Sequence, residues 1–195
     1  SPSDTPMVPP TNRDVSPGEL EAAERYRVLL ERLVSTSPEL AAAFMEAAPS
    51  VAYRIGYEHL QRWARTGEQL ATGGWASLGL AIQFFETTPE LLDLIDFDAF
   101  SVLVDTTALL ASSTADLASD CLGQVGHAIG ALPNGTRRPF LEVLRIMAAR
   151  CRADLDRCLE RTPVLLAPLS EEIHGPLLEL ARHGVQMEGG GAFAL

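Results

Sequence analysis

The sequence predicts an all-α fold, and three observations carry that prediction. Helix-start signals recur, with a capping-box arrangement at Ser16-Pro17-Gly18-Glu19 and a hydroxyl residue before Pro-Glu at Ser37-Pro38-Glu39 and Thr88-Pro89-Glu90. Apolar residues recur three and four positions apart over long windows, which lines one face of a helix. No convincing window alternates β-branched with polar residues, as a half-buried strand would.

The first expected element is an N-terminal segment without regular structure, called the lead-in. Residues 1–15 contain four prolines and few apolar residues, so an extended, mobile segment is expected there. A helix is predicted from Ser16 to about Val34, with one apolar face made of Ala22, Tyr26, Leu29 and Leu33. Residues 16–187 are expected to form a single helical-repeat domain, and residues 188–195, with three consecutive glycines, a flexible tail.

Two segments are predicted to lie in the core. Trp75 to Phe85 is apolar almost all round, which is typical of a helix enclosed between neighbours on both sides. One long helix is predicted from about Thr136 to Leu159, with a core stripe formed by Phe140, Leu144, Met147, Cys151, Leu155 and Cys158.

The three cysteines indicate reduced thiols. Cys151 and Cys158 lie seven positions apart in that predicted helix, and two helical turns separate them by about 10.5 Å, beyond the reach of a disulfide. With Cys121 the set is odd in number. We therefore expect small core residues in a cytoplasmic protein.

A hexamer recurs along the chain. FFETTP at residues 84–89 resembles FMEAAP at residues 44–49, and further likenesses occur at residues 128–133 and 158–163. Helix pairs repeating every ~40 residues are typical of HEAT or armadillo proteins. We predict an α-solenoid-like stack of helical hairpins, in which each recurring proline ends one helix and starts the next. An irregular helical bundle is the alternative.

The composition excludes several function classes. The chain has 26 acidic and 15 basic residues and a net charge of −11, which opposes binding to nucleic acid or anionic lipid. All the basic residues are arginine, so neither Schiff-base catalysis nor a phosphate-loop lysine is available. The longest apolar run is far short of the ~20 residues of a membrane-spanning helix.

The acidic phrase LLDLIDFDAF has two interpretations. Asp93, Asp96 and Asp98 lie close enough in sequence to bind a hard cation or to act in acid–base chemistry. The favoured interpretation is that Asp96 and Asp98 cap the following helix and that the group is a solvated surface. The four histidines follow no metal-binding spacing. No catalytic, cofactor or metal site is predicted.

An arginine row is the candidate docking surface. Arg138, Arg145 and Arg152 recur every seven residues opposite the predicted core stripe, in a segment that is basic within an acidic chain. Such a row could dock an acidic protein partner, since arginine is favoured at interfaces. The alternative is a solvated face, in which Arg138 pairs with Glu142 and Arg152 with Asp156.

One stretch resembles a known family. WARTGEQL at residues 63–70, followed by AIQFFETTPELL at residues 81–92, is similar to the helical-repeat region of NorD/CbbO-type von Willebrand factor A proteins, which are partners of MoxR-type AAA+ ATPases. The resemblance implies a helical scaffold that couples such an ATPase to a client enzyme. The family's Asp-x-Ser-x-Ser metal motif does not occur in this sequence, so no metal-binding residue is carried over.

The predicted function is therefore a non-catalytic protein-interaction scaffold or adaptor. The alternative is a small-molecule-binding or enzymatic helical domain. Its pocket would lie between helices and be lined by Trp63, Trp75, Phe84 and Phe85.

Overall fold

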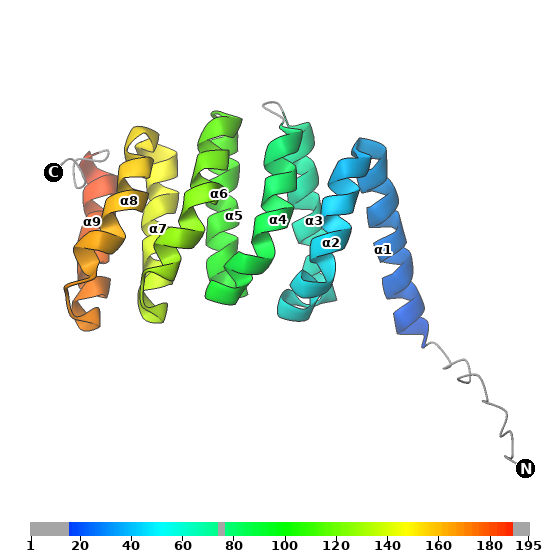
Figure 1. The fold of residues 1–195 in the computed structure, drawn as a ribbon, viewed down its shortest axis with the longest axis horizontal. Coiled ribbons are helices and arrows are strands. Elements are labelled where there is room, and N and C mark those ends of the chain that lie inside the picture. The colour runs from blue at the N-terminus through cyan, green and yellow to red at the C-terminus, as the bar shows by residue number, and fades with distance from the viewer. Residues whose placement is uncertain (1–15, 74–76, 189–195) are drawn as a thin grey trace, which may run out of the picture.

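The computed structural model describes residues 16–73 and 77–188, and nearly all of these are helical. The chain forms these elements in order: α1 (Pro17–Thr36), α2 (Pro38–Ile55), α3 (Tyr57–Thr72), α4 (Leu78–Leu94), α5 (Phe97–Ala111), α6 (Ala115–Gly130), α7 (Asn134–Arg150), the 3-10 helix η1 (Arg152–Asp154), α8 (Leu155–Leu166) and α9 (Glu171–Glu188) (Figure 1). No strand occurs in this part of the chain, which confirms the predicted all-α class.

The helices form a two-layer stack. In one layer α2 packs on α4, α4 on α6 and α6 on α8, and in the other α1, α3, α5, α7 and α9 follow one another (Figure 1). Each helix packs mainly on helices one or two places away in the chain. Phe44 of α2 and Phe84 of α4, equivalent in the proposed repeat, are both buried. The sequence repeat itself stays a prediction.

The caps show why most helices begin where they do. The Ser16 hydroxyl accepts from the Glu19 amide and the Glu19 carboxylate accepts from the Ser16 amide, both at 3.2 Å, which completes the predicted capping box. The predicted start at Ser37 is also confirmed, since its hydroxyl accepts from the Leu40 amide. Side chains of Ser77, Asp96 and Thr114 cap α4, α5 and α6 in the same way.

The role predicted for the recurring prolines is wrong in three places. Pro49, Pro89 and Pro163 lie inside α2, α4 and α8, so Thr88-Pro89 does not start a helix. An interior proline removes one backbone hydrogen bond. Buried side chains on both sides of it hold the helix together, as Phe84 and Phe85 before Pro89 and Leu91 and Leu92 after it do in α4.

The long helix predicted from about Thr136 to Leu159 is also wrong. α7 ends at Arg150, Cys151 adopts a non-helical backbone (φ −146°, ψ 60°), and η1 turns the chain into α8. All six residues of the predicted stripe are nevertheless buried. The apolar spacing continues across the break because α7 and α8 both face the same core. The periodicity of apolar residues therefore could not reveal the turn at Cys151.

Several predictions fall outside the described residues. Trp75, the lead-in at residues 1–15 and residues 189–195 of the tail are among them. The described part of the apolar segment, Leu78 to Phe85, begins α4, which packs on α2, α3 and α6. Leu80, Ala81, Phe84 and Phe85 are buried, whereas Leu78 is 37% exposed, so the enclosed helix is confirmed only from Leu80 onward. In the same described ranges, no helix combines the length and apolar character needed to span a bilayer.

Candidate interaction surfaces

The aromatic residues predicted to line a pocket pack into the core. Trp63, Phe84 and Phe85 are at most 3% exposed. The ring centroids of Trp63 and Phe85 lie 4.8 Å apart and those of Phe84 and Phe85 lie 5.8 Å apart. Phe44 joins them at 5.3 Å from Trp63. The space beside Trp63, towards α5, measures only about 20 Å³, which is about enough for one water. These three residues therefore fill the interior.

A glycine explains the spacing of the Trp63-to-Leu70 phrase. Gly67 lies one turn after Trp63 on the same face of α3, and the Phe85 ring packs directly over it. A Cβ at Gly67 would lie 2.1 Å from Cζ of Phe85, inside any allowed contact. The Trp63 indole N–H donates to the Thr88 hydroxyl at 3.0 Å, and that hydroxyl donates to the Phe84 carbonyl at 2.6 Å. The phrase is thus a packing device between α3 and α4.

The acidic phrase serves capping and pairing. The Asp96 carboxylate accepts from the Ala99 amide at 2.8 Å, which confirms its predicted role as the cap of α5. Asp93 pairs with Arg54 of α2, and Asp98 lies 3.9 Å from Arg138 of α7. No group of three or more potential metal ligands converges anywhere in the described ranges.

The arginine row is only partly assembled. Arg138 and Arg145 lie on α7 and face acids of α5, at 3.9 Å from Asp98 and 4.0 Å from Asp105. Arg152 does not continue the row, because α7 ends before it; its Nε donates to the Ala148 carbonyl at 2.8 Å. Exposed pairs of this kind contribute at most about 1 kcal/mol each. The predicted three-residue row is therefore corrected to two arginines that join α7 to α5.

The three cysteines are buried and reduced, as predicted. Burial raises the pKa of Cys121 to about 12 and that of Cys158 to about 11. Both thiols are therefore protonated near neutral pH, and neither is a thiolate nucleophile.

Sequence reasoning missed a buried histidine at the end of the stack. His174 of α9 is 3% exposed, and its Nε2 lies 2.8 Å from the Leu166 carbonyl and 3.1 Å from the Leu169 carbonyl. Carbonyls only accept, so Nε2 carries the proton and Nδ1 accepts from the Thr136 hydroxyl at 3.0 Å. The ring ties the α8–α9 connection to the start of α7. No local sequence pattern signals it, because Thr136 lies 38 positions away and the Leu166 and Leu169 carbonyls are reached only through the turn between α8 and α9.

The C-terminal end of the stack carries an uncovered apolar surface. Of the fourteen large apolar side chains that are exposed in the described residues, seven lie between positions 164 and 187: Val164, Leu165, Leu169, Ile173, Leu177, Leu180 and Met187. The α9 members are spaced by four, three and seven residues, the spacing of a helix–helix seam. They lie roughly 120° round the helix from the buried residues His174, Leu178 and Val185, at about 100° per residue. We name the row on α9, made of Ile173, Leu177, Leu180 and Met187, the end face.

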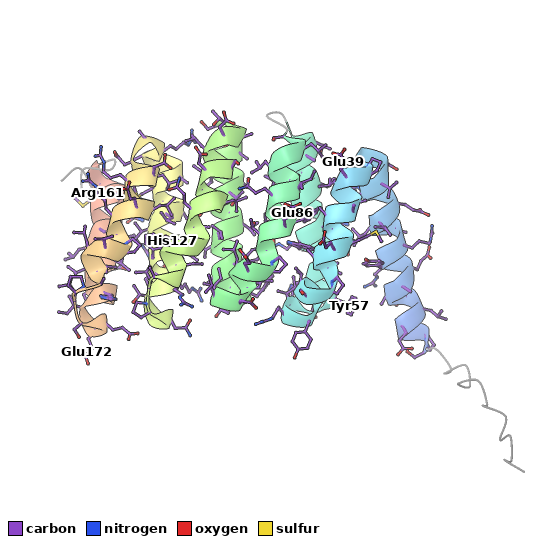
Figure 2. All side chains as sticks on the ribbon, in the orientation of Figure 1. Glu39, Tyr57, Glu86, His127, Arg161 and Glu172 are labelled. Atoms are coloured by element: carbon purple, nitrogen blue, oxygen red, sulfur yellow. The ribbon has the colours of Figure 1, made fainter. Side chains whose placement is uncertain are left out.

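The N-terminal end of the stack has a different outer surface. On α1 the positions that face away from the core include Glu24, Arg27 and Glu31, and Arg27 pairs with both glutamates. Arg25 also pairs with Glu21. Figure 2 shows that charged side chains also mark the outer face of the even-numbered layer, at Glu39, Glu86 and Arg161.

No family model matches the chain, and neither a curated protein nor a solved structure does.

Proposed function

We propose that this chain is a non-catalytic scaffold that binds another protein through the end face. The observation that carries the proposal is the exposed apolar seam on α9, with Leu180 68% and Met187 84% exposed. On α1, by contrast, Arg27 pairs with Glu24 and Glu31 on the exposed side of the helix. An uncovered apolar end marks a binding surface.

The occupant that fits the end face is an amphipathic α-helix of a partner protein. α9 already packs on α7 through residues that recur along one side, and the end face offers a second row with coiled-coil spacing. Exposed Glu172 and Glu179 lie along one side of that row. The partner helix should therefore carry apolar residues every three or four positions, with arginine or lysine beside them.

The resemblance noted in the sequence suggests where to look first. A MoxR-type AAA+ ATPase, or the client enzyme that it remodels, is the first partner to test. The scaffold is proposed to act in the cytoplasm, which the three unpaired cysteines support. The net charge of −11 favours a protein partner over a nucleic acid.

The test compares two double variants of the full chain. Leu180→Glu with Met187→Glu places charge on the end face, and Leu20→Glu with Val28→Glu makes the same change at exposed positions of α1. A partner is identified by affinity purification and mass spectrometry, then purified for calorimetric titration. We expect the α9 variant to bind at least tenfold more weakly, because two apolar contacts are lost, and the α1 variant to bind normally.

The two outcomes that would overturn the proposal are distinct. Equal binding by wild type and both variants would place the partner elsewhere on the stack. Failure of a candidate ATPase and of a candidate client to bind the wild-type chain would remove the proposed coupling. Circular dichroism of each variant checks that the helices are intact.

A further inference from the structure

A groove at the other end of the stack has no occupant among the described residues. It lies between the first half of α1, the end of α2 and the start of α3, with a volume of about 690 Å³. Its floor and walls include Ala22, Tyr26, Ala48, Pro49, Tyr57 and Leu60. Figure 1 shows the first half of α1 diverging from α2 and α3 at this point.

The groove is apolar with aromatic walls. The two polar side chains at its mouth are Ser16 and Glu19, and each already accepts a hydrogen bond from the other residue's backbone amide in the capping box. Tyr57 is 72% exposed and projects beyond the first turn of α3 (Figure 2). A ligand would therefore meet alanine, proline and tyrosine surfaces and no uncommitted carboxylate in this lining.

The apolar stripe of α1 is covered over only half its length. Leu29 and Leu33 in the second half are buried, whereas every residue from 16 to 25 is exposed. Ala22, which continues the stripe of Tyr26 and Leu29, lines the groove. An apolar chain laid in the groove would complete the packing of this helix.

We propose that Pro6–Pro10 of the chain's own N-terminal segment occupies the groove as a polyproline II strand. The sequence Pro6-Met7-Val8-Pro9-Pro10 contains a P-x-x-P motif. Grooves walled by aromatic side chains bind such segments, because the preformed strand loses little entropy on docking. This docking is independent of the end face and of the function proposed for it.

The lengths agree. Along α1, Ser16 and Tyr26 are separated by about 15 Å at 1.5 Å per residue. Five residues of polyproline II also span about 15 Å at 3.1 Å per residue. Residues 11–15 are long enough to turn the chain back from Ser16, and attachment at Ser16 keeps the segment at an effective concentration in the millimolar range.

A paramagnetic label on the full chain tests the proposal. Val8→Cys places a reactive thiol in the segment, and the three native cysteines are buried, so a nitroxide attaches selectively. We expect the label to broaden the backbone amide signals of Ala22, Ala52 and Tyr57 more strongly than those of α8 and α9. Tyr57→Ala should weaken docking about tenfold, because one aromatic contact is lost.

Two controls keep the test decisive. Tyr53→Ala removes an even more exposed tyrosine, at 88%, from outside the groove lining and should leave the broadening unchanged. Replacing Pro6, Pro9 and Pro10 with serine should reduce the broadening as Tyr57→Ala does. Broadening that is absent or uniform over the stack, or that survives both Tyr57→Ala and the proline changes, would overturn the proposal.

Discussion

The two ends of the stack are held together by different chemistry. Around α1 to α4, aromatic rings make up much of the core: Phe44, Trp63 and Phe85 contact one another, and Phe85 packs over Gly67. Around α7 to α9, a polar group, His174, ties three segments together. The outer surfaces differ as well, since α1 exposes ion pairs beside Leu20, Val28 and Val34, whereas α9 exposes a row of four apolar residues beside its charged ones. The end with less aromatic packing is the one that we propose binds a partner.

The largest effect is expected at the ring-packed end, from Gly67→Ala. The new Cβ would overlap the Phe85 ring, and overpacking costs about 1–3 kcal/mol or more. The free energy of unfolding, measured in urea, should fall accordingly. The matched control is Gly123→Ala on α6, where the nearest atom would lie at 3.8 Å; it should raise stability by up to ~1 kcal/mol. Equal effects at the two glycines would contradict the packing described for α3 and α4.

The next effect is expected at the other end, from His174→Ala. This change leaves the Thr136 hydroxyl and two carbonyls without their partner, and the expected loss is about 1–3 kcal/mol. His183→Ala, which alters an exposed histidine on the same helix, should change stability by less than about 0.5 kcal/mol. Hydrogen exchange should show the loss first in α8 and α9. A uniform loss of hydrogen-exchange protection over all helices would contradict the view that the two ends of the stack are stabilised independently.

The smallest effect per group is a pH dependence from the buried thiols of α6 and α8. The pKa of Cys121 is raised to about 12 and that of Cys158 to about 11, against roughly 8.5 when unfolded. The folded state thus favours the protonated thiols. Their contribution is complete below about pH 8.5 and is lost as the pH rises through 11 and 12. At pH 9.5 the loss is about 1 kcal/mol per thiol.

Two probes separate the halves in that experiment. Both tryptophans, Trp63 and Trp75, belong to the N-terminal half of the sequence, so their fluorescence follows the ring-packed end, whereas circular dichroism follows every helix. At pH 9.5 the dichroism should decay at lower urea than the fluorescence does. A variant with Cys121→Ala and Cys158→Ala should lose this separation, and a separation that persists would have another cause.

Local chemistry in the sequence predicts much of the fold. The all-α class and the caps at Ser16, Ser37 and Asp96 depend on nearby residues only. The errors occur where distant contacts override local preference. Pro89 stays inside α4 because buried residues flank it, and the turn at Cys151 is invisible because α7 and α8 share one core. The end face could be found only once α9 was placed last in the stack, with His174 and not Leu177 turned inward.

The order of packing along the stack has a consequence for how the chain folds. Each helix packs mainly on helices one or two places away, so the contact order is low. The early steps of folding therefore do not require segments far apart in the sequence to meet. Neighbouring helices then unfold as coupled units, because the stability of the stack is approximately the sum of the stabilities of its units and of the interfaces between neighbouring units. Opening should spread inward from a terminus, and the energy needed should depend on which terminus opens first.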